Sequence, residues 1–418
     1  MIGSIEGYYG VPLSHHARRE HMSWMATKGL DLFAYAPKDD PYHRDKWREM
    51  HPADDMDAFA DLIAHGRKVG VDFCYTISPG LDWSAGDEDA LTLKLKSLRA
   101  IGCDAMAILW DDVPPGGADL GETHGRANAA AVKAIDGVRW WTVGTDYAIG
   151  EATSYLEALC RETPDEMLVA WTGPYVVPLD ITAELAARIG EAVGRKLLLW
   201  ENFPVNDGAM AGVLHMGPYP ERDAALPGVS SGVLLNTMQQ PIASRIGIAS
   251  GAAFWQDPTT DKETVWRAAL GEITGIEAFA RASRSWVSHP GPSDELVAML
   301  DDTKALRTYL EGGVRKGLGE DVIAEIEPWL QAWEREAQAM LMGLDILDRG
   351  YRSGPRGMAG GVLWTRARLS EQQVFGIRQA VYPVFQQRGK ESTAHEATTV
   401  VGDNLTDMLM RRALQRNL

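Results

Sequence analysis

The feature that most constrains the fold is a repeated alternation in the first 240 residues between short apolar runs and amphipathic stretches. The apolar runs are rich in β-branched and aromatic residues and indicate strands, whereas the stretches between them have the helical period. The predicted strands are Ser4–Tyr9, Leu30–Ala36, Val71–Ile77, Ala105–Asp111, Trp140–Thr145, Met167–Trp171, Lys196–Trp200 and Gly232–Asn236. Most are almost continuously apolar, as expected for strands covered on both faces. Eight strands, each followed by helical sequence, favour a (β/α)8 TIM barrel, an α/β fold, over a doubly wound sheet.

Two segments leave the strand count open by one. The stretch after Asp207 is only weakly helical, and Ala252–Trp255 has the composition of a further strand.

Strand signals nearly stop after Asp257-Pro258. Residues 296–310 and 321–347 have amphipathic helical patterns, and the second carries one apolar stripe. We therefore predict a catalytic barrel over 1–260 and an α-helical domain over 261–418, with a glycine-rich loop at 349–361. The stripe is too apolar to face water, so we expect it to pack in a helical bundle against the barrel. A homodimer is the alternative that would also cover it.

Charge and cysteine content limit the classes of binding partner and the cellular location that we expect. The net charge of −17 repels phosphate backbones and anionic lipid, which argues against nucleic acid and membrane as main partners. No apolar window approaches the length of a bilayer-spanning helix, and the amino terminus has no signal-peptide pattern. The three cysteines are far apart and form neither a disulfide framework nor a CxxC zinc motif, so we expect a cytoplasmic protein.

Carboxylates, amides and aromatic residues gather where the predicted strands end. In a (β/α)8 barrel the active site lies at the carboxyl ends of the strands, so these residues should meet. The segments are Glu6–Gly10, Ala36–His43, Ile77–Gly80, Leu109–Asp112, Gly144–Tyr147, Ala170–Gly173, Trp200–Asp207 and Leu235–Met238.

The pair Asp111-Asp112 is the most informative of these. Neighbouring residues of a regular strand point to opposite faces, so both carboxylates enter one pocket only if the strand ends there and the backbone turns. The proline- and glycine-rich segment 113–117 allows such a turn. Two close carboxylates repel, so we expect one pKa to rise, which suits an acid that protonates a glycosidic oxygen. The structural alternative is a helix cap or a solvated turn.

Seven ordered motifs resemble the catalytic domain of the family-84 glycoside hydrolases, which are β-N-acetylglucosaminidases. They are EGYYG, YAPKDDPYHRDKWRE, ISPGLDW, ILWDDV, AWTGP, LLLWENFPVND and LLNTMQQ, and the match covers about residues 4–260. The stretch EIEPWLQAW is similar to the helical domain of that family.

The resemblance implies a retaining exo-β-N-acetylglucosaminidase in which the 2-acetamido oxygen of the sugar is the nucleophile and forms an oxazoline. It implies that Asp111 orients the acetamido group and that Asp112 is the general acid and then the base. It also implies that Tyr147 hydrogen-bonds the acetamido oxygen. The remaining predicted sugar contacts are Gly7, Lys38, Thr172, Trp200, Asn202, Asp207 and Asn236. The substrate is a terminal β-linked GlcNAc, with protein O-GlcNAc, a glycan end and a cell-wall fragment as open aglycones.

Three positions depart from the pattern of the family. Glu201 replaces a usual aspartate, Thr237 stands where proline is common, and Gly144–Tyr147 is a loose version of its motif. These departures put the surroundings of the subsite in question more than its core chemistry.

Other signals point elsewhere and are set aside. The GxSxG sequence at 228–232 precedes a strand, whereas a nucleophile elbow follows one. His15, His16 and His21 lie on one predicted helix, and a solvated face explains them better than a metal. Asp39, Asp40 and His43 are expected in a loop that fixes Lys38. The sequence thus predicts no metal and no cofactor. The alternative to an enzyme is a non-catalytic sugar-binding barrel, for which the acid Asp112 would have no purpose.

Overall fold

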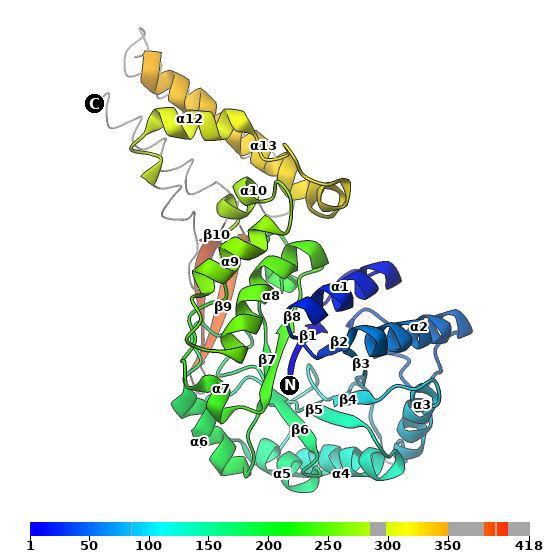
Figure 1. The fold of residues 1–418 in the computed structure, drawn as a ribbon. Helices are drawn as coiled ribbons and strands as arrows, with labels where there is room; N and C mark the ends of the chain where they lie inside the picture. Colours follow the sequence, from blue (N-terminus) through cyan, green and yellow to red (C-terminus); the bar gives the residue numbers. More distant parts are fainter. Residues whose placement is uncertain (85, 285–297, 350–379, 389–390, 400–418) are drawn as a thin grey trace.

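The protein is seen here as a computed structural model that describes all residues except 85, 285–297, 350–379, 389–390 and 400–418. Eight parallel strands close into a barrel in which each strand pairs with its neighbours in the sequence and β8 pairs with β1 (Figure 1). The strands are β1 (Ile2–Glu6), β2 (Leu32–Tyr35), β3 (Asp72–Ile77), β4 (Ala105–Leu109), β5 (Arg139–Val143), β6 (Met167–Trp171), β7 (Leu198–Glu201) and β8 (Gly232–Asn236). The predicted (β/α)8 barrel is confirmed.

Helices connect successive strands and cover the outside of the barrel (Figure 1). They are α1 (His15–Thr27), α2 (Ala53–Val69), α3 (Glu88–Ala100), α4 (Ala118–Ala134), α5 (Ser154–Glu162), α6 (Ala183–Val193), α7 (Leu226–Val229) and α8 (Pro241–Gln256), with a short 3₁₀ turn η1 (Gly208–Met210). The segment Ala252–Trp255, which had the composition of a strand, lies inside α8. It is buried on most sides, and an apolar run covered all round has no amphipathic period by which to distinguish a helix from a strand.

Several strands end earlier than predicted, and β1 and β4 matter most for the site. β1 stops at Glu6 instead of Tyr9, and β4 stops at Leu109 instead of Asp111. The residues between are still mostly apolar or aromatic, but they leave the sheet and turn over the carboxyl end of the barrel. This is the region where the candidate site forms.

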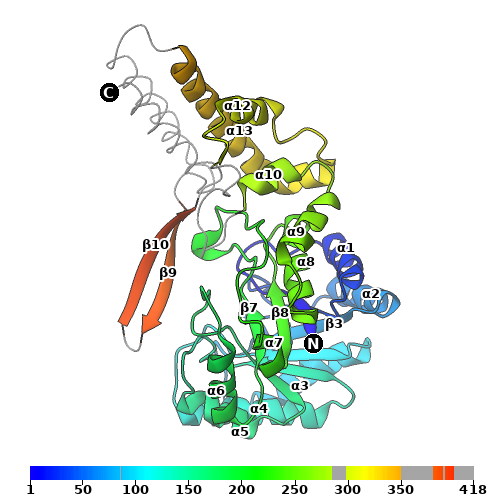
Figure 2. The same ribbon diagram turned by 60° about the vertical axis from the view of Figure 1, so that its left-hand side comes forward.

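Helices follow the barrel in the described part of the second region. They are α9 (Lys262–Gly271), α10 (Glu277–Ala282), α12 (Thr303–Gly312) and α13 (Glu320–Arg349) (Figure 2). α13 bends at Ile326, two residues before Pro328, because proline cannot continue the hydrogen-bond ladder. Its apolar stripe is largely buried against the other helices and against barrel residues such as Met238 and Ile246. A single chain therefore covers the stripe.

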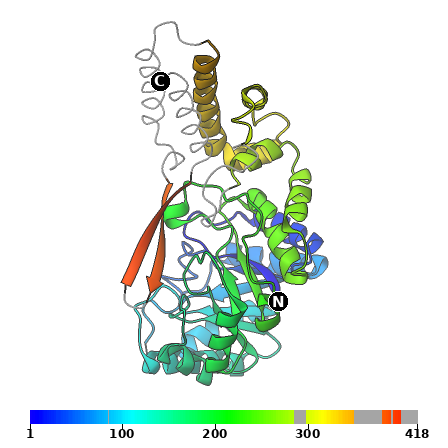
Figure 3. The ribbon, with the colours of Figure 1, turned by 90° about the vertical axis from the view of Figure 1, so that its left-hand side faces the viewer.

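An antiparallel pair of strands lies in the region predicted to be helical. β9 (Ala380–Arg388) pairs with β10 (Glu391–Thr399), and the two strands lie beside the barrel (Figure 3). The expectation of helix alone over 261–418 was therefore wrong for residues 380–388 and 391–399. Their β-branched and aromatic residues, Val381, Tyr382, Val384, Phe385, Thr393, Thr398 and Thr399, favour strands. Apart from Arg349, which ends α13, the loop predicted at 349–361 lies outside the described residues.

Candidate active site

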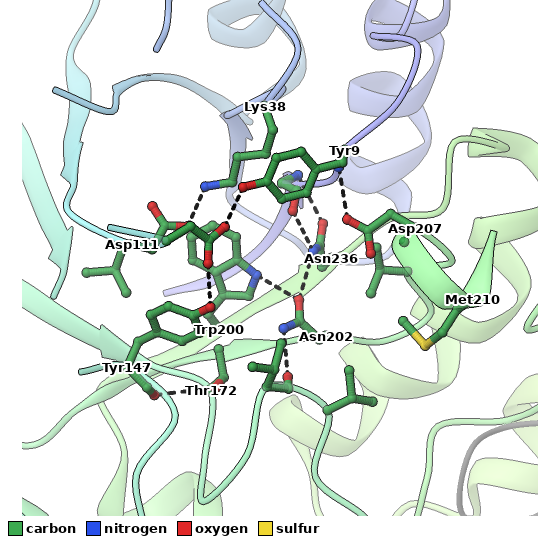
Figure 4. A pocket seen from close by; sticks show the side chains of 17 residues that line it. Tyr9, Lys38, Asp111, Tyr147, Thr172, Trp200, Asn202, Asp207, Met210 and Asn236 are labelled. Atoms are coloured by element: carbon green, nitrogen blue, oxygen red, sulfur yellow. Dashed lines mark hydrogen bonds and ion pairs between the residues drawn. The ribbon is translucent and has the colours of Figure 1, made fainter. Parts of the chain in front are cut away.

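A cavity of about 190 Å³ opens at the carboxyl end of the barrel, where side chains from most of the strand ends converge (Figure 4). All ten predicted site residues line it: Gly7, Lys38, Asp111, Asp112, Tyr147, Thr172, Trp200, Asn202, Asp207 and Asn236. The roles that the resemblance implies for them stay predictions. What the structure establishes is that residues spread over 230 positions of the chain meet in one place.

The two aspartates enter the cavity because the backbone turns between them. β4 ends at Leu109, and Asp112 has φ of 56°, in the left-handed region that residues other than glycine rarely adopt. Asp111 is 5% exposed and forms an ion pair with Lys38, whereas Asp112 is exposed. One carboxylate thus lies deep in the cavity and the other near its mouth. Strained backbone of this kind gathers at functional sites.

Both carboxylate oxygens of Asp112 accept hydrogen bonds from tyrosines. Tyr147 donates to Oδ1 at 2.6 Å and Tyr9 donates to Oδ2 at 2.7 Å. Burial pushes the pKa of Asp112 up, but the Lys38 charge, these two hydrogen bonds and Arg44 outweigh burial and lower it. The sequence predicted that one pKa of the pair would rise, but at Asp112 the pKa is lowered. Sequence showed the neighbouring carboxylate but not the donors that surround it.

A chain of amide hydrogen bonds fixes one wall of the cavity. Asn202 Oδ1 accepts from the Trp200 indole N–H at 3.0 Å and from Asn236 Nδ2 at 2.9 Å. Asn236 also bonds both backbone groups of Gly7, each at 3.0 Å. A side chain at Gly7 would meet the Trp200 ring at 2.5 Å, so only glycine fits there. The wall is preorganised before any ligand arrives.

Thr172 and Tyr147 are held together at the base of the site. The Thr172 N–H and hydroxyl both donate to the Tyr147 carbonyl oxygen, at 2.8 and 3.3 Å, and the hydroxyl also donates to the Tyr175 carbonyl at 2.8 Å. The Trp200 ring closes this part of the cavity, with the Lys38 ammonium 5.4 Å from its centroid. These contacts fix the backbone of Tyr147.

Asp207 joins the loop after β7 to the loop after β1. Its Oδ2 accepts from the Tyr9 backbone N–H at 2.9 Å. Burial raises the pKa of Asp207, and the nearby Asp112 charge also raises it. The carboxylate still has acceptor capacity for a ligand hydroxyl.

The departure at Glu201 does not change the cavity lining. Its side chain points away into a buried cluster, where both oxygens accept from Arg222 at 3.0 Å and one accepts from the Tyr219 hydroxyl at 2.8 Å. Glu201 is 1% exposed and the Arg222 side chain is fully buried. The longer acid therefore supports β7 from behind.

Residues that the sequence reasoning did not single out also line the cavity. They are Tyr9, Val143, Val176, Val177, Val205, Gly208 and Met210. Tyr9 stands in the same EGYYG motif as Gly7, and its polar hydroxyl could have marked it. The valines carry no such signal, because an apolar residue at a strand end looks like core.

His21 corrects another expectation. It is fully buried, not part of a solvated face, and its Nε2 lies 3.0 Å from the Ser4 hydroxyl. Burial lowers its pKa to about 3, so it is neutral. No group of three or more potential metal ligands occurs in the part of the chain that the structure describes. Within the same residues no helix is long and apolar enough to cross a bilayer.

A (β/α)8 barrel whose carboxyl end holds two adjoining aspartates, one buried and one at the cavity mouth, has the features of a glycoside hydrolase. The sequence model of the beta-N-acetylglucosaminidase family matches residues 2–287. The chain belongs to this family of glycoside hydrolases, and the resemblance inferred from the seven motifs is confirmed.

Individual relatives agree with this assignment. The chain is 29% identical over 275 residues to protein O-GlcNAcase from Rattus norvegicus and equally to that from Mus musculus. The match covers 61% of this chain but only 30% of each relative. Among solved structures, a mutant O-GlcNAc hydrolase from Thermobaculum terrenum superposes with a TM-score of 0.82 at 24% identity, covering 99% of this chain and 94% of that one. That likeness supports the fold.

Proposed function

We propose that the protein is a retaining exo-β-N-acetylglucosaminidase that removes terminal β-linked GlcNAc by substrate-assisted catalysis. The observation that carries the proposal is that both aspartates come from one strand end. In this proposal neither aspartate attacks the far face of the sugar. The nucleophile comes from the substrate, whose 2-acetamido group provides the oxygen, as the resemblance to the family implies.

Each aspartate has a distinct part in this mechanism. Asp111, deep in the cavity and paired with Lys38, accepts the acetamido N–H and so strengthens the acetamido oxygen as a nucleophile. Tyr147 supports the same group through its hydroxyl. Asp112, at the cavity mouth, protonates the departing oxygen while the oxazoline forms, and afterwards removes a proton from the attacking water. Two inversions at the anomeric carbon give net retention.

The wall residues hold the sugar. Trp200 and Thr172 enclose the acetyl methyl group, Asn202 lies beside the acetamido group, and Lys38 and Asp207 bind ring hydroxyls together with Asn236 and the Gly7 backbone. The polar contacts among these residues are already formed, so little ordering is needed when the sugar enters. No metal or cofactor takes part.

The aglycone we favour is a serine or threonine of a polypeptide. Large apolar side chains stand exposed on the loops around the mouth: Tyr9, Val11, Leu81 and Val176 are 44, 77, 47 and 47% exposed. Such a rim suits a peptide better than a polar glycan chain. The buried free cysteines and the acidic charge fit a cytoplasmic setting.

The decisive experiment compares an aryl β-N-acetylglucosaminide with the matched aryl β-glucoside. We expect turnover of the first and essentially none of the second, because the glucoside lacks the nucleophile. Comparable rates on both would indicate a nucleophile in the protein and would refute the mechanism. Tight binding of the N-acetylglucosaminide without turnover would instead support the alternative, a sugar-binding barrel.

A further inference from the structure

Tyr9 holds a position beside Asp112 that the mechanism above does not use. It lies in the loop between β1 and α1, and its hydroxyl donates to Asp112 Oδ2 at 2.7 Å. Tyr147 approaches the same carboxylate from the other side and donates to Oδ1 (Figure 4). Tyr9 is 44% exposed and lines the cavity, so it lies where the cavity opens to solvent.

Tyr9 and Tyr147 cannot both stay hydrogen-bonded to Asp112 through the proposed reaction. Tyr147 is needed at the acetamido oxygen once a sugar is bound, and turning there frees Oδ1 of Asp112. Asp112 Oδ1 can then carry the proton that is delivered, while Oδ2 still accepts from Tyr9. Tyr9 is left as the phenol that fixes the carboxyl.

The loop that carries Tyr9 is tied to its surroundings. The Tyr9 N–H donates to Asp207 at 2.9 Å, the Gly10 N–H to Asp39 at 3.0 Å and the Val11 N–H to Gln239 at 3.2 Å. These partners belong to the loops after β7, β2 and β8. Tyr9 is therefore placed by a rigid frame despite its exposure.

Arg44 joins the aromatic ring to the backbone of the acid. Its guanidinium carbon lies 5.9 Å from the centre of the Tyr9 ring, and its Nη2 donates to the Asp112 carbonyl oxygen at 3.2 Å. Arg44 is only 6% exposed. One cation thus supports both the phenol and the left-handed turn at Asp112.

We propose that Tyr9, supported by Arg44, is a positioning residue that aims Asp112 at the glycosidic oxygen and stabilises its ionised form between the two steps. The inference rests on the proposed function, in which Asp112 is the acid. In the first step Asp112 gives its proton to the leaving oxygen as the anomeric C–O bond breaks and the acetamido oxygen bonds to carbon. In the second step water bonds to the anomeric carbon, gives a proton to Asp112, and the oxazoline C–O bond opens.

The ionisation of Asp112 depends on all the polar groups that face it. These are Tyr9, Lys38, Arg44, Asp111, Tyr147 and Asp207. Removing one phenol from this set destabilises the carboxylate, so the pKa of the acid should rise. A hydrogen bond to a charged group accounts for about one pKa unit or slightly more.

The test is Tyr9→Phe in the full chain, with Tyr8→Phe as the matched control. Tyr8 is the neighbouring phenol of the same loop, but its hydroxyl donates to the Val11 carbonyl at 3.3 Å and not to the acid. The measurements are kcat and kcat/KM against pH, where kcat reports the sugar-bound state, and a series of N-acetylglucosaminides with good and poor leaving groups. Thermal unfolding is used to check that both variants are folded.

For Tyr9→Phe we expect the basic limb of the pH profile to move up by about one unit, in line with the loss of one charged hydrogen bond. Rates should fall about tenfold on alkyl leaving groups and much less on activated phenols, since only the former need the acid. Tyr8→Phe should show neither change. An unmoved basic limb, a loss independent of the leaving group, or the same shift in Tyr8→Phe would overturn the inference. If the wild type itself turns over no N-acetylglucosaminide, the proposed function fails instead.

Discussion

Asp111 and Asp112 are neighbours in the sequence, yet their surroundings differ. Asp111 is buried against the Lys38 ammonium, whereas Asp112 is exposed and accepts from two phenols. The proposed division between a fixed carboxylate and one that exchanges protons rests on this difference. It depends on the left-handed backbone at Asp112, because an extended strand would send one of the two side chains out of the cavity.

At the same scale, Glu201 is predicted to stabilise the barrel without touching substrate. Glu201→Gln leaves the buried Arg222 charge uncompensated, which should lower the free energy of unfolding by about 3 to 5 kcal/mol. Urea unfolding measures the loss. The control is Glu122→Gln, which breaks exposed pairs with Arg126 and Arg161 and should cost less than about 1 kcal/mol. Equal losses in the two variants would contradict the role given to the buried pair.

Sequence predicted the site residues better than their partners. Asp111 and Asp112 were visible because polar residues at a strand end have few structural reasons to be there. The hydrogen bonds of Asp112 to Tyr9 and Tyr147 join loops 103 and 35 residues away, and no local pattern encodes such distances. The lowered pKa of Asp112 follows from those contacts, so it could not be foreseen from an adjacent pair of acids.

At the scale of elements, the start of α8 depends on the second region of the chain. Gln240, the residue before α8, makes no side-chain hydrogen bond that caps the helix. Glu325 of α13 supplies it, accepting from the Ile242 N–H at 3.0 Å and the Ala243 N–H at 2.8 Å. α8 follows β8, whose last residue is Asn236, so this contact links the helices to the wall of the site.

The Glu325 cap predicts a specific pH dependence. Burial raises the pKa of Glu325 from 4.5 to about 7. The folded chain therefore binds a proton that the unfolded chain has already released, and the free energy of unfolding falls as pH rises from about 4.5 to 7. The contribution amounts to up to about 3 kcal/mol. The Glu325→Gln variant should lack this pH-dependent contribution to the free energy of unfolding.

Urea unfolding of wild type and Glu325→Gln at pH 5 and pH 8 tests this. We expect wild type to lose stability relative to the variant at pH 8. A difference that is the same at both pH values would show that Glu325 titrates normally in the folded chain.

The elements of the barrel could be predicted because each strand is an uninterrupted apolar run between helical patterns. Boundaries were less certain, since the chain leaves the sheet at Glu6 and Leu109 while its composition stays apolar or aromatic. The hairpin β9–β10 was missed, because its strands do not continue the alternation that identified the barrel.

At the scale of the whole molecule, the helical region and the barrel share apolar contacts. Trp329 donates to the Gly212 carbonyl at 2.9 Å, in the segment that follows Asp207 and η1. Trp333, Met238 and Ile246 belong to one buried cluster that crosses the predicted boundary at residue 260. We therefore propose that the helices stabilise the active-site loops as well as themselves.

Truncation tests that proposal. A chain ending at residue 262 would expose the barrel side of this cluster, so we expect aggregation or at least a tenfold loss of kcat/KM, measured beside size-exclusion chromatography. A chain ending at residue 349 keeps the helices α9, α10, α12 and α13 and serves as the control. A soluble, monomeric and fully active 1–262 chain would show that the helices are dispensable.

The central claim is that Asp112 is the general acid and Asp111 orients the substrate's own nucleophile. A leaving-group series of N-acetylglucosaminides measured on Asp112→Asn and Asp111→Asn tests it most directly. We predict that Asp112→Asn loses about 10²- to 10⁴-fold on poor leaving groups and far less on activated phenols, which depart without a proton. Asp111→Asn should lose severely and almost equally on every substrate, since all need the acetamido oxygen. Reversed slopes would exchange the two roles, and near-wild-type rates in both variants would show that this pair is not the catalytic site.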